Sequence, residues 1–292
     1  MKLLVTGDSW TYGSELRSPL LKKEDLDTHE NNDEYRTTMA WPYKLSKLIY
    51  NVDDLINLSK PSASNDRIVR ELINYLTENY IKDKKPVDDL FVIVGFSSLD
   101  RVDFFYDGLF GRGWETMWPK FNHHYKFTDI QDFSKLYNES FSTIYGDFHR
   151  YVNQLQFLEL FFEKHHIKYM FFHGFYHHQN KFISNWEDVL YVNGLAYESS
   201  TYYPKLHNKL DLDRWEDINP IRFVDKNKPI HSFHNRIKKI ADDKNIQFDE
   251  IFAKHLGMHP SELGHTLWAD YLYEYMKEHK KIFDIIVEKE II

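Results

Sequence analysis

The residues that could do chemistry begin with a serine at the end of an apolar run. The chain starts MKLLVTGDSWTYGSE, and its first apolar run stops at Gly-Asp-Ser. A serine here can be a turn residue, a helix N-cap or a nucleophile. A nucleophilic serine needs a base to take its proton, and histidine is suited to this at neutral pH. Ser9 is therefore a candidate nucleophile if a histidine is held beside it.

His259 has the surroundings that such a base needs. It lies in GMHPSELGHTLWADYL, where Pro260 restrains the backbone and Ser261 followed by Glu262 is typical of a helix start. Apolar side chains at helical spacing would pack that helix against the core, namely Leu263, Leu267 and Tyr271. A surface histidine preceding a helix is the alternative interpretation, and without Ser9 it is the better one.

The elements that must position these residues alternate along the chain. Runs typical of buried strands occur in KLLVTGDS, DDLINLSK, LFVIVGFS and IKYMFFHGF. Helical spacing occurs near WPYKLSKLIY, in RIVRELINYLTENYI, over residues 141–166, near HSFHNRIKKIADDKN and in the last segment. Alternation of this kind predicts an α/β protein, a three-layer α/β/α sandwich with a central parallel sheet. GDS, SKPSASN, GFSS and HGF would then meet at the carboxyl ends of the strands, where such sheets bind ligands.

The remaining segments suggest one domain over residues 1–292 that carries insertions. LKKEDLDTHENNDEYR is expected to be a charged loop, and Ser64, Asn65 or Asp66 could cap the helix that follows SKPSASN. Residues at about 103–132 and 176–229 are rich in aromatic side chains without a clean period, which predicts irregular insertions.

In their order, the blocks GDSW, NLSKPSASN, VGFSS and HPSELGH resemble the SGNH (GDSL-type) hydrolase family, in a divergent form. The resemblance extends over nearly the whole chain and implies a flavodoxin-like fold. It implies Ser9 as nucleophile, His259 as general base and the Ser9 backbone N–H in the oxyanion hole. Asp8 matches the acidic residue before the serine, for which we expect a structural role, and Trp10 is a candidate substrate contact.

Two oxyanion positions depart from the pattern that the resemblance implies. Where the family has a glycine in the second block, this chain has Ser62, or Ala63 if the loop shifts by one. The backbone N–H survives that change, although a positive φ would strain a non-glycine residue. Where the family has an asparagine in the third block, this chain has Ser97, whose hydroxyl has a shorter reach. Asn65 or Arg101 could replace the missing amide donor.

The acidic position departs as well. The family usually has an aspartate three residues before the histidine, and here that residue is Leu256. A main-chain carbonyl could orient the imidazole instead, which would give a Ser-His dyad, or Asp249 or Glu250 could reach it. Intact serine and histidine with altered supporting residues suggest a specialised enzyme or a pseudoenzyme.

Composition limits the other functions. The net charge is −8 without a basic stripe, which argues against nucleic acid as a partner. There is no run of about 20 apolar residues, no signal-peptide core and no cysteine, so we expect a cytoplasmic protein with no membrane partner and no disulfides. No glycine-rich phosphate loop occurs, and no cofactor is expected.

Two groups of residues invite a metal site. One is the histidine cluster of FFHGFYHHQNKF, and the other is the acidic segment LDLDRWEDINP. We favour an ordinary loop for both, because no carboxylate completes the first and the second lacks the spacing of a calcium loop. The histidines are His173, His177 and His178, and the acidic residues are Asp211, Asp213, Glu216 and Asp217.

The expected activity is therefore hydrolysis of an acyl or acetyl ester on a small polar or carbohydrate molecule. We favour AT-rich coding and core packing as the explanation of the 17% aromatic content, and stacking surfaces for a sugar or another ring are the alternative. Divergent proteins of this kind resemble ones encoded by tailed bacteriophages. The alternatives are a non-catalytic binding or assembly module, and an acyl or glycosyl transferase that uses the same pocket.

Overall fold

The structure is a computed structural model of the 292-residue chain. It describes residues 1–19, 29–99, 101–108, 111–117, 128–140, 144–174, 191–192, 195–196, 217–224, 232–253 and 259–283.

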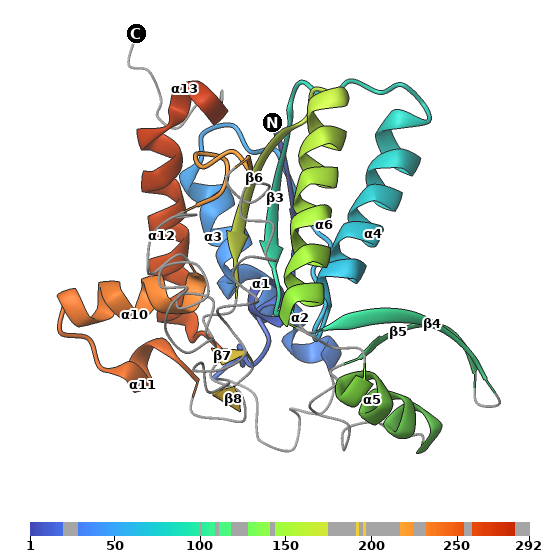
Figure 1. The fold of residues 1–292 in the computed structure, drawn as a ribbon. Coiled ribbons are helices and arrows are strands. Elements are labelled where there is room, and N and C mark those ends of the chain that lie inside the picture. The colour runs from blue at the N-terminus through green and yellow to red at the C-terminus, as the bar shows by residue number, and fades with distance from the viewer. Residues whose placement is uncertain are drawn as a thin grey trace, which may run out of the picture.

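A four-stranded parallel sheet forms the centre of the molecule (Figure 1). Its strands are β1 (Lys2–Thr6), β2 (Asp54–Asn57), β3 (Leu90–Phe96) and β6 (Lys168–His173), in the spatial order β2-β1-β3-β6. Beyond β6 the sheet continues as two parallel bridges, Phe171 with Phe223 and His173 with Ser232. Parallel strands require crossover connections, and helices supply them. The α/β fold class expected from the sequence is confirmed.

Helices cover both faces of the sheet, which gives three layers (Figure 1). On one face α4 (Asn65–Leu76) and α6 (Ile144–Lys164) pack against alternate residues of the strands, including Leu4, Val92 and Phe171. On the other face lie α3 (Trp41–Leu48), α10 (Phe233–Asp243) and α12 (Glu262–Glu278). Alternate side chains of a strand point to opposite faces, so each strand contributes to both cores.

The structure has further helices and strands besides these. They are α1 (Ser9–Tyr12), α2 (His29–Met39), a π-helical turn (Thr77–Ile81), β4 (Val102–Gly108), β5 (Gly111–Met117), α5 (Thr128–Ser140), β7 (Tyr191–Val192), β8 (Leu195–Ala196), α11 (Phe248–Ile251) and α13 (Lys280–Phe283). Within these described ranges, no helix is long and apolar enough to cross a membrane.

The expectation of a charged loop over LKKEDLDTHENNDEYR is wrong for its second half. From His29 onward the chain is helical, as α2. The helix lacks a strong apolar face, so periodicity does not reveal it. Polar contacts to a distant segment hold it instead: Asn32 bonds the backbone of Leu16 and Ser18, and Arg36 donates to the Tyr12 carbonyl.

The first insertion is also more regular than expected. Residues 102–117 contain the antiparallel hairpin of β4 and β5, with Phe105 opposite Trp114. The two rings contact edge to face at a centroid distance of 5.6 Å, a favourable cross-strand pair. Most of the second insertion lies outside the described residues.

Candidate active site

The Ser9 hydroxyl and the His259 imidazole meet at the carboxyl-terminal edge of the sheet. Ser9 Oγ lies 2.9 Å from His259 Nε2, across 250 residues of sequence. This is hydrogen-bond distance, and it is the separation that a general base needs from the hydroxyl it deprotonates. The pair can therefore transfer a proton without rearrangement.

The turn after β1 fixes Ser9. Asp8 is the N-cap of α1, and its carboxylate accepts a hydrogen bond from the Trp10 backbone N–H at 3.0 Å. Gly7 is needed just before it, because a Cβ there would lie 2.4 Å from Thr11 Oγ1. Ser9 itself is 6% exposed, so its hydroxyl is rigid and close to the surface.

His259 is held from both sides by backbone contacts. Its carbonyl accepts from Ala253 N–H at 2.8 Å, and the Ser261 N–H donates to the Ile251 carbonyl. Ser261 is the N-cap of α12, as the sequence predicts. The buried Trp10 ring lies 6.2 Å from the imidazole and also packs on Phe233 and Phe252. Trp10 is 1% exposed, so in this structure it packs under the site and does not form its surface.

Asp8, Ser97 and Arg101 form a buried polar group next to Ser9. The Ser97 hydroxyl donates to Asp8 Oδ2 at 2.9 Å, and Arg101 donates to Ser97 Oγ at 2.7 Å. The Arg101 guanidinium also lies 3.5 Å from Asp8 Oδ2 and donates to the Ala63 carbonyl. Burial raises the pKa of Asp8, while Arg101 and the hydrogen bonds from Trp10 and Ser97 partly offset this effect.

The Asn65 side chain joins the second and third strand ends. Its Oδ1 accepts from the Ser97 backbone N–H at 2.7 Å, and its Nδ2 donates to the Ser97 carbonyl at 3.3 Å. A hydroxyl has one hydrogen, and that of Ser97 is given to Asp8. In the described arrangement, the side chains of Ser97, Asn65 and Arg101 thus bond Asp8, one another or nearby backbone.

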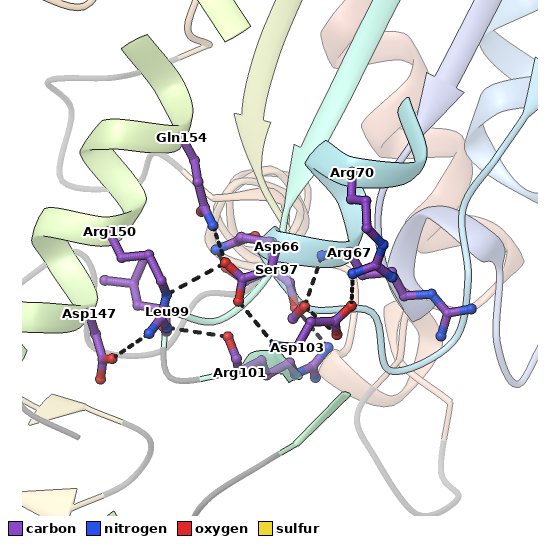
Figure 2. A network of polar contacts seen from close by, with 12 residues as sticks. Asp66, Arg67, Arg70, Ser97, Leu99, Arg101, Asp103, Asp147, Arg150 and Gln154 are labelled. Carbon is purple, nitrogen blue, oxygen red and sulfur yellow. Dashed lines mark hydrogen bonds and ion pairs between the residues drawn. The ribbon is translucent and has the colours of Figure 1, made fainter. Parts of the chain in front are cut away.

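A second polar network anchors the chain that carries Arg101 (Figure 2). Arg150 of α6 donates to the carbonyls of Leu99 and Arg101. Asp103 binds Arg70 and Ser64, and its backbone N–H donates to Asp66. The nearby acids Asp66 and Asp147 raise the pKa of Arg150, although burial opposes this. These contacts tie the start of β4 to α4 and α6.

Ser62 adopts the conformation that favours glycine. Its φ is 62°, in the left-handed region. This is the position where the SGNH pattern that the sequence resembles has a glycine. The adjacent Ala63 N–H donates to the Lys60 carbonyl in a turn. The sequence offered the N–H of Ser62 or that of Ala63 as the oxyanion donor of the second block. The Ala63 N–H is already engaged within the loop.

Sequence reasoning missed Glu15. Its Oε1 lies 3.2 Å from His259 Nδ1, with 16% of the Glu15 side chain and 18% of the His259 side chain exposed. Glu15 follows α1, far from His259 in sequence, and its spacing carries no recognisable signal. Leu256, at the position where the SGNH pattern has its aspartate, lies outside the described residues. Glu250 accepts a hydrogen bond from the Gln247 N–H at the start of α11.

No cluster of three or more potential metal ligands occurs among the described residues. His173 is 1% exposed at the end of β6, with its Nε2 3.1 Å from the Tyr151 hydroxyl. His177, His178, Asp211, Asp213 and Glu216 lie outside the described residues, and Asp217 is exposed.

Comparisons with known proteins bear on the family and the fold. The model of a family of unknown function, DUF6071, matches residues 21–194. The matched segment begins after Ser9 and ends before His259. No curated protein matches the chain.

Solved structures of GDSL-type and esterase proteins resemble the chain at low identity. One is a G-D-S-L family protein from Desulfitobacterium hafniense, assigned as lipolytic, with 11% identity, a TM-score of 0.37, and coverage of 94% of this chain and 98% of that one. Another is a carbohydrate esterase whose active site displays divergent catalytic and non-catalytic binding functions, with 14% identity and a TM-score of 0.43. The alignment covers 97% of this chain and 66% of that chain. No statement about activity follows from either structure.

Proposed function

Because the chain belongs to the DUF6071 family, whose function is unknown, we propose its activity from its own site: the protein is a serine ester hydrolase. The 2.9 Å contact between Ser9 Oγ and His259 Nε2 carries the proposal. A serine and a histidine brought together from distant segments at the ligand-binding edge of a parallel sheet suit nucleophilic acyl transfer.

The chemistry would proceed in two halves. Ser9 Oγ attacks the ester carbonyl while His259 Nε2 takes its proton, and the protonated imidazole then returns that proton to the departing alcohol. In the second half, His259 Nε2 takes a proton from water as the water attacks the acyl-serine. The imidazolium then gives that proton to Ser9 Oγ as the acyl–oxygen bond breaks, which releases the acid and restores both residues. Both halves use the same nitrogen, so its contact with Ser9 is the essential geometry.

Backbone N–H groups are the proposed oxyanion donors. Ser9 N–H lies at the start of α1, and Ser62 N–H is favoured over Ala63 because the latter donates to Lys60. Asp8, Ser97, Asn65 and Arg101 would support the site by fixing the strand ends. Preorganised donors of this kind are typically worth about 10²–10³ in rate each.

The proposed substrate is a small acyl ester, such as an acetyl ester, on a polar or carbohydrate molecule. Phe105 and Trp114 on the β4–β5 hairpin are 47% and 51% exposed, and Arg70 lies over the Trp114 ring. Exposed aromatic side chains with polar neighbours provide a surface suited to mixed apolar and polar ligands. The proposed substrate class comes from the resemblance seen in the sequence, and these two rings are candidate contacts for such a substrate.

Replacing Ser9 tests the nucleophile. We expect Ser9→Ala to lower kcat/KM for p-nitrophenyl acetate by at least about 10³-fold and to abolish labelling by a fluorophosphonate probe. Ser46→Ala is the matched control, because Ser46 is also a buried serine and its hydroxyl donates to the Tyr43 carbonyl of its own helix. This control should keep wild-type labelling and turnover.

One observation favours a second function, a non-catalytic binding module. The side chains of Ser97, Asn65 and Arg101 are engaged within the protein, which leaves backbone groups to stabilise an oxyanion. If wild type and Ser9→Ala both fail to react with ester and probe, or both are labelled equally, the hydrolase proposal is wrong and the binding module is the better account.

A further inference from the structure

A carboxylate faces the ring nitrogen of His259 that does not contact Ser9. We propose that Glu15 is the positioning residue for His259, so that the site is a Ser9–His259–Glu15 triad whose acid comes from the loop after the nucleophile. The inference rests on the proposed hydrolase function. Its first support is distance: Glu15 Oε1 is 3.2 Å from Nδ1, while Nε2 is 2.9 Å from Ser9 Oγ.

The backbone of Glu15 gives a second, independent support. Its φ is 68°, in the left-handed region that favours glycine, and Gly13 takes a similar φ of 81° in the same turn. A glutamate in that region is strained, and strained residues persist where the surrounding structure or function requires them. Glycine would fit the backbone better, and a role for the carboxylate would account for the glutamate at this position.

The second carboxylate oxygen gives a third support. Glu15 Oε2 is buried and has no hydrogen-bond partner among the described residues. A buried, incompletely paired carboxylate costs stability, and it is electrostatically most effective toward a nearby cation because water does not screen it. The group opposite it is the imidazole, which becomes a cation when it takes the Ser9 proton.

Helix α2 holds Glu15 in place. Asn32 Nδ2 donates to the Leu16 carbonyl at 2.6 Å, and the Ser18 N–H donates to Asn32 Oδ1 at 2.8 Å. Arg36 donates to the Tyr12 carbonyl at 2.6 Å and lies over the Tyr12 ring. The backbone on both sides of Glu15 is thus bonded to one helix, as a positioning residue requires.

The proton balance follows from these contacts. In the proposed triad the imidazole carries its proton on Nδ1, facing the Glu15 carboxylate, which leaves Nε2 free to accept from Ser9. The carboxylate then stabilises the imidazolium that forms when Nε2 takes the Ser9 proton. Its present contact is at ion-pair distance but lacks hydrogen-bond alignment, and such contacts tighten when substrate binds.

Three substitutions at Glu15 separate positioning from a purely structural role. We expect Glu15→Gln to lower kcat for p-nitrophenyl acetate by about 10²-fold or more with KM changed by less than about threefold, and Glu15→Asp to recover part of kcat. Glu15→Gly should lower kcat similarly while its thermal midpoint stays equal or rises, because the strain and the buried oxygen are both removed. A structural residue would lose stability instead.

Two matched controls lie away from the site. Glu71→Gln removes a carboxylate from α4 that pairs with Arg67, and Lys84→Gly relieves a similar positive φ of 51°. Both should keep wild-type kcat.

Nitrogen-15 NMR of His259 provides a readout that does not require turnover. In the wild type the neutral ring should carry its proton on Nδ1, and Glu15→Gly should move it toward Nε2. The inference is overturned if hydrolysis depends on Ser9 while Glu15→Gln keeps wild-type kcat, or if Glu15→Gly leaves the tautomer unchanged. Absence of Ser9-dependent hydrolysis in the wild type overturns the proposed function instead, and the NMR result still decides whether Glu15 sets the tautomer.

Discussion

At the scale of single residues, the site depends on backbone conformation as much as on side-chain type. Ser62 and Glu15, both named in the proposed site, take a positive φ of 62° and 68°. For Ser62 the backbone N–H is the proposed functional group, so the hydroxyl is not needed there. For Glu15 the side chain is the proposed functional group, and a strained backbone is compatible with such a role.

This difference predicts the effect of relieving strain at Ser62. We expect Ser62→Gly to raise the free energy of unfolding by about 0.5–1 kcal/mol, because the left-handed conformation costs about 1–2 kcal/mol and glycine gives part of this back as unfolded-chain entropy. Urea unfolding measures it. Lys60→Gly, in the same loop without a positive φ, should lower the free energy of unfolding. A loss of stability in Ser62→Gly would contradict the strain argument.

At the scale of elements, the ends of three strands are joined through Asp8, Ser97 and Arg101. Asp8 follows β1, Ser97 follows β3 and Arg101 precedes β4, and all three are buried. Arg101 is itself held by Arg150 through its carbonyl (Figure 2). Because Asp8 also caps α1, the helix that begins at Ser9, this group sets where Ser9 lies.

Removing the cation should therefore destabilise the fold. We expect Arg101→Met to cost about 3–5 kcal/mol of unfolding free energy, because it leaves Asp8 buried without its positive neighbour. In an Asp8→Asn background the same substitution should cost clearly less, since no charge remains to be compensated. A double-mutant cycle by urea unfolding measures the coupling, and additive effects of the two substitutions would show that the pair does not interact.

At the scale of the whole molecule, two cores on opposite faces of one sheet hold the two halves of the site together. Ser9 belongs to the N-terminal strand-helix unit, and His259 precedes α12, which packs on α3 through Trp41, Leu45 and Trp268. Within that core lies His265, fully buried, whose Nδ1 accepts from the Trp41 backbone N–H. Burial, followed by Lys44 and His259, lowers the pKa of His265 to about 3.

The buried histidine predicts a pH dependence of stability. Between its ordinary pKa of 6.5 and about 3, the unfolded chain binds a proton at His265 that the folded protein does not. The stability that the neutral, buried His265 contributes is therefore fully present above pH 6.5. Below that value the free energy of unfolding falls by about 1.4 kcal/mol per pH unit. Unfolding free energies at pH 7.5 and 5 measure it.

His265→Asn is the variant that isolates this contribution, because it keeps an acceptor for the Trp41 N–H but cannot titrate. It should lose less stability between the two pH values than the wild type. Equal losses in both proteins would show that His265 does not account for the acid sensitivity.

The sequence alone determined the fold class and the pair at the centre of the site. Apolar runs followed by polar turns identified the four strands and the ends where Asp8, Ser9 and Ser97 lie, because burial imposes a local pattern. The Ser261 N-cap could also be predicted, because a serine followed by Glu262 is a local pattern. The helix α2 and the β4–β5 hairpin were not, because polar contacts to a distant segment and pairing between strands hold them.

Only the tertiary structure decided which groups support the pair. Glu15 reaches His259 because α2 holds its loop against the chain before α12, a contact between distant segments that no local pattern encodes. The same is true of Ser97, whose hydroxyl is used by Asp8 at another strand end. Local residue patterns determine elements, whereas distances and backbone conformations between elements arise only when the whole chain packs.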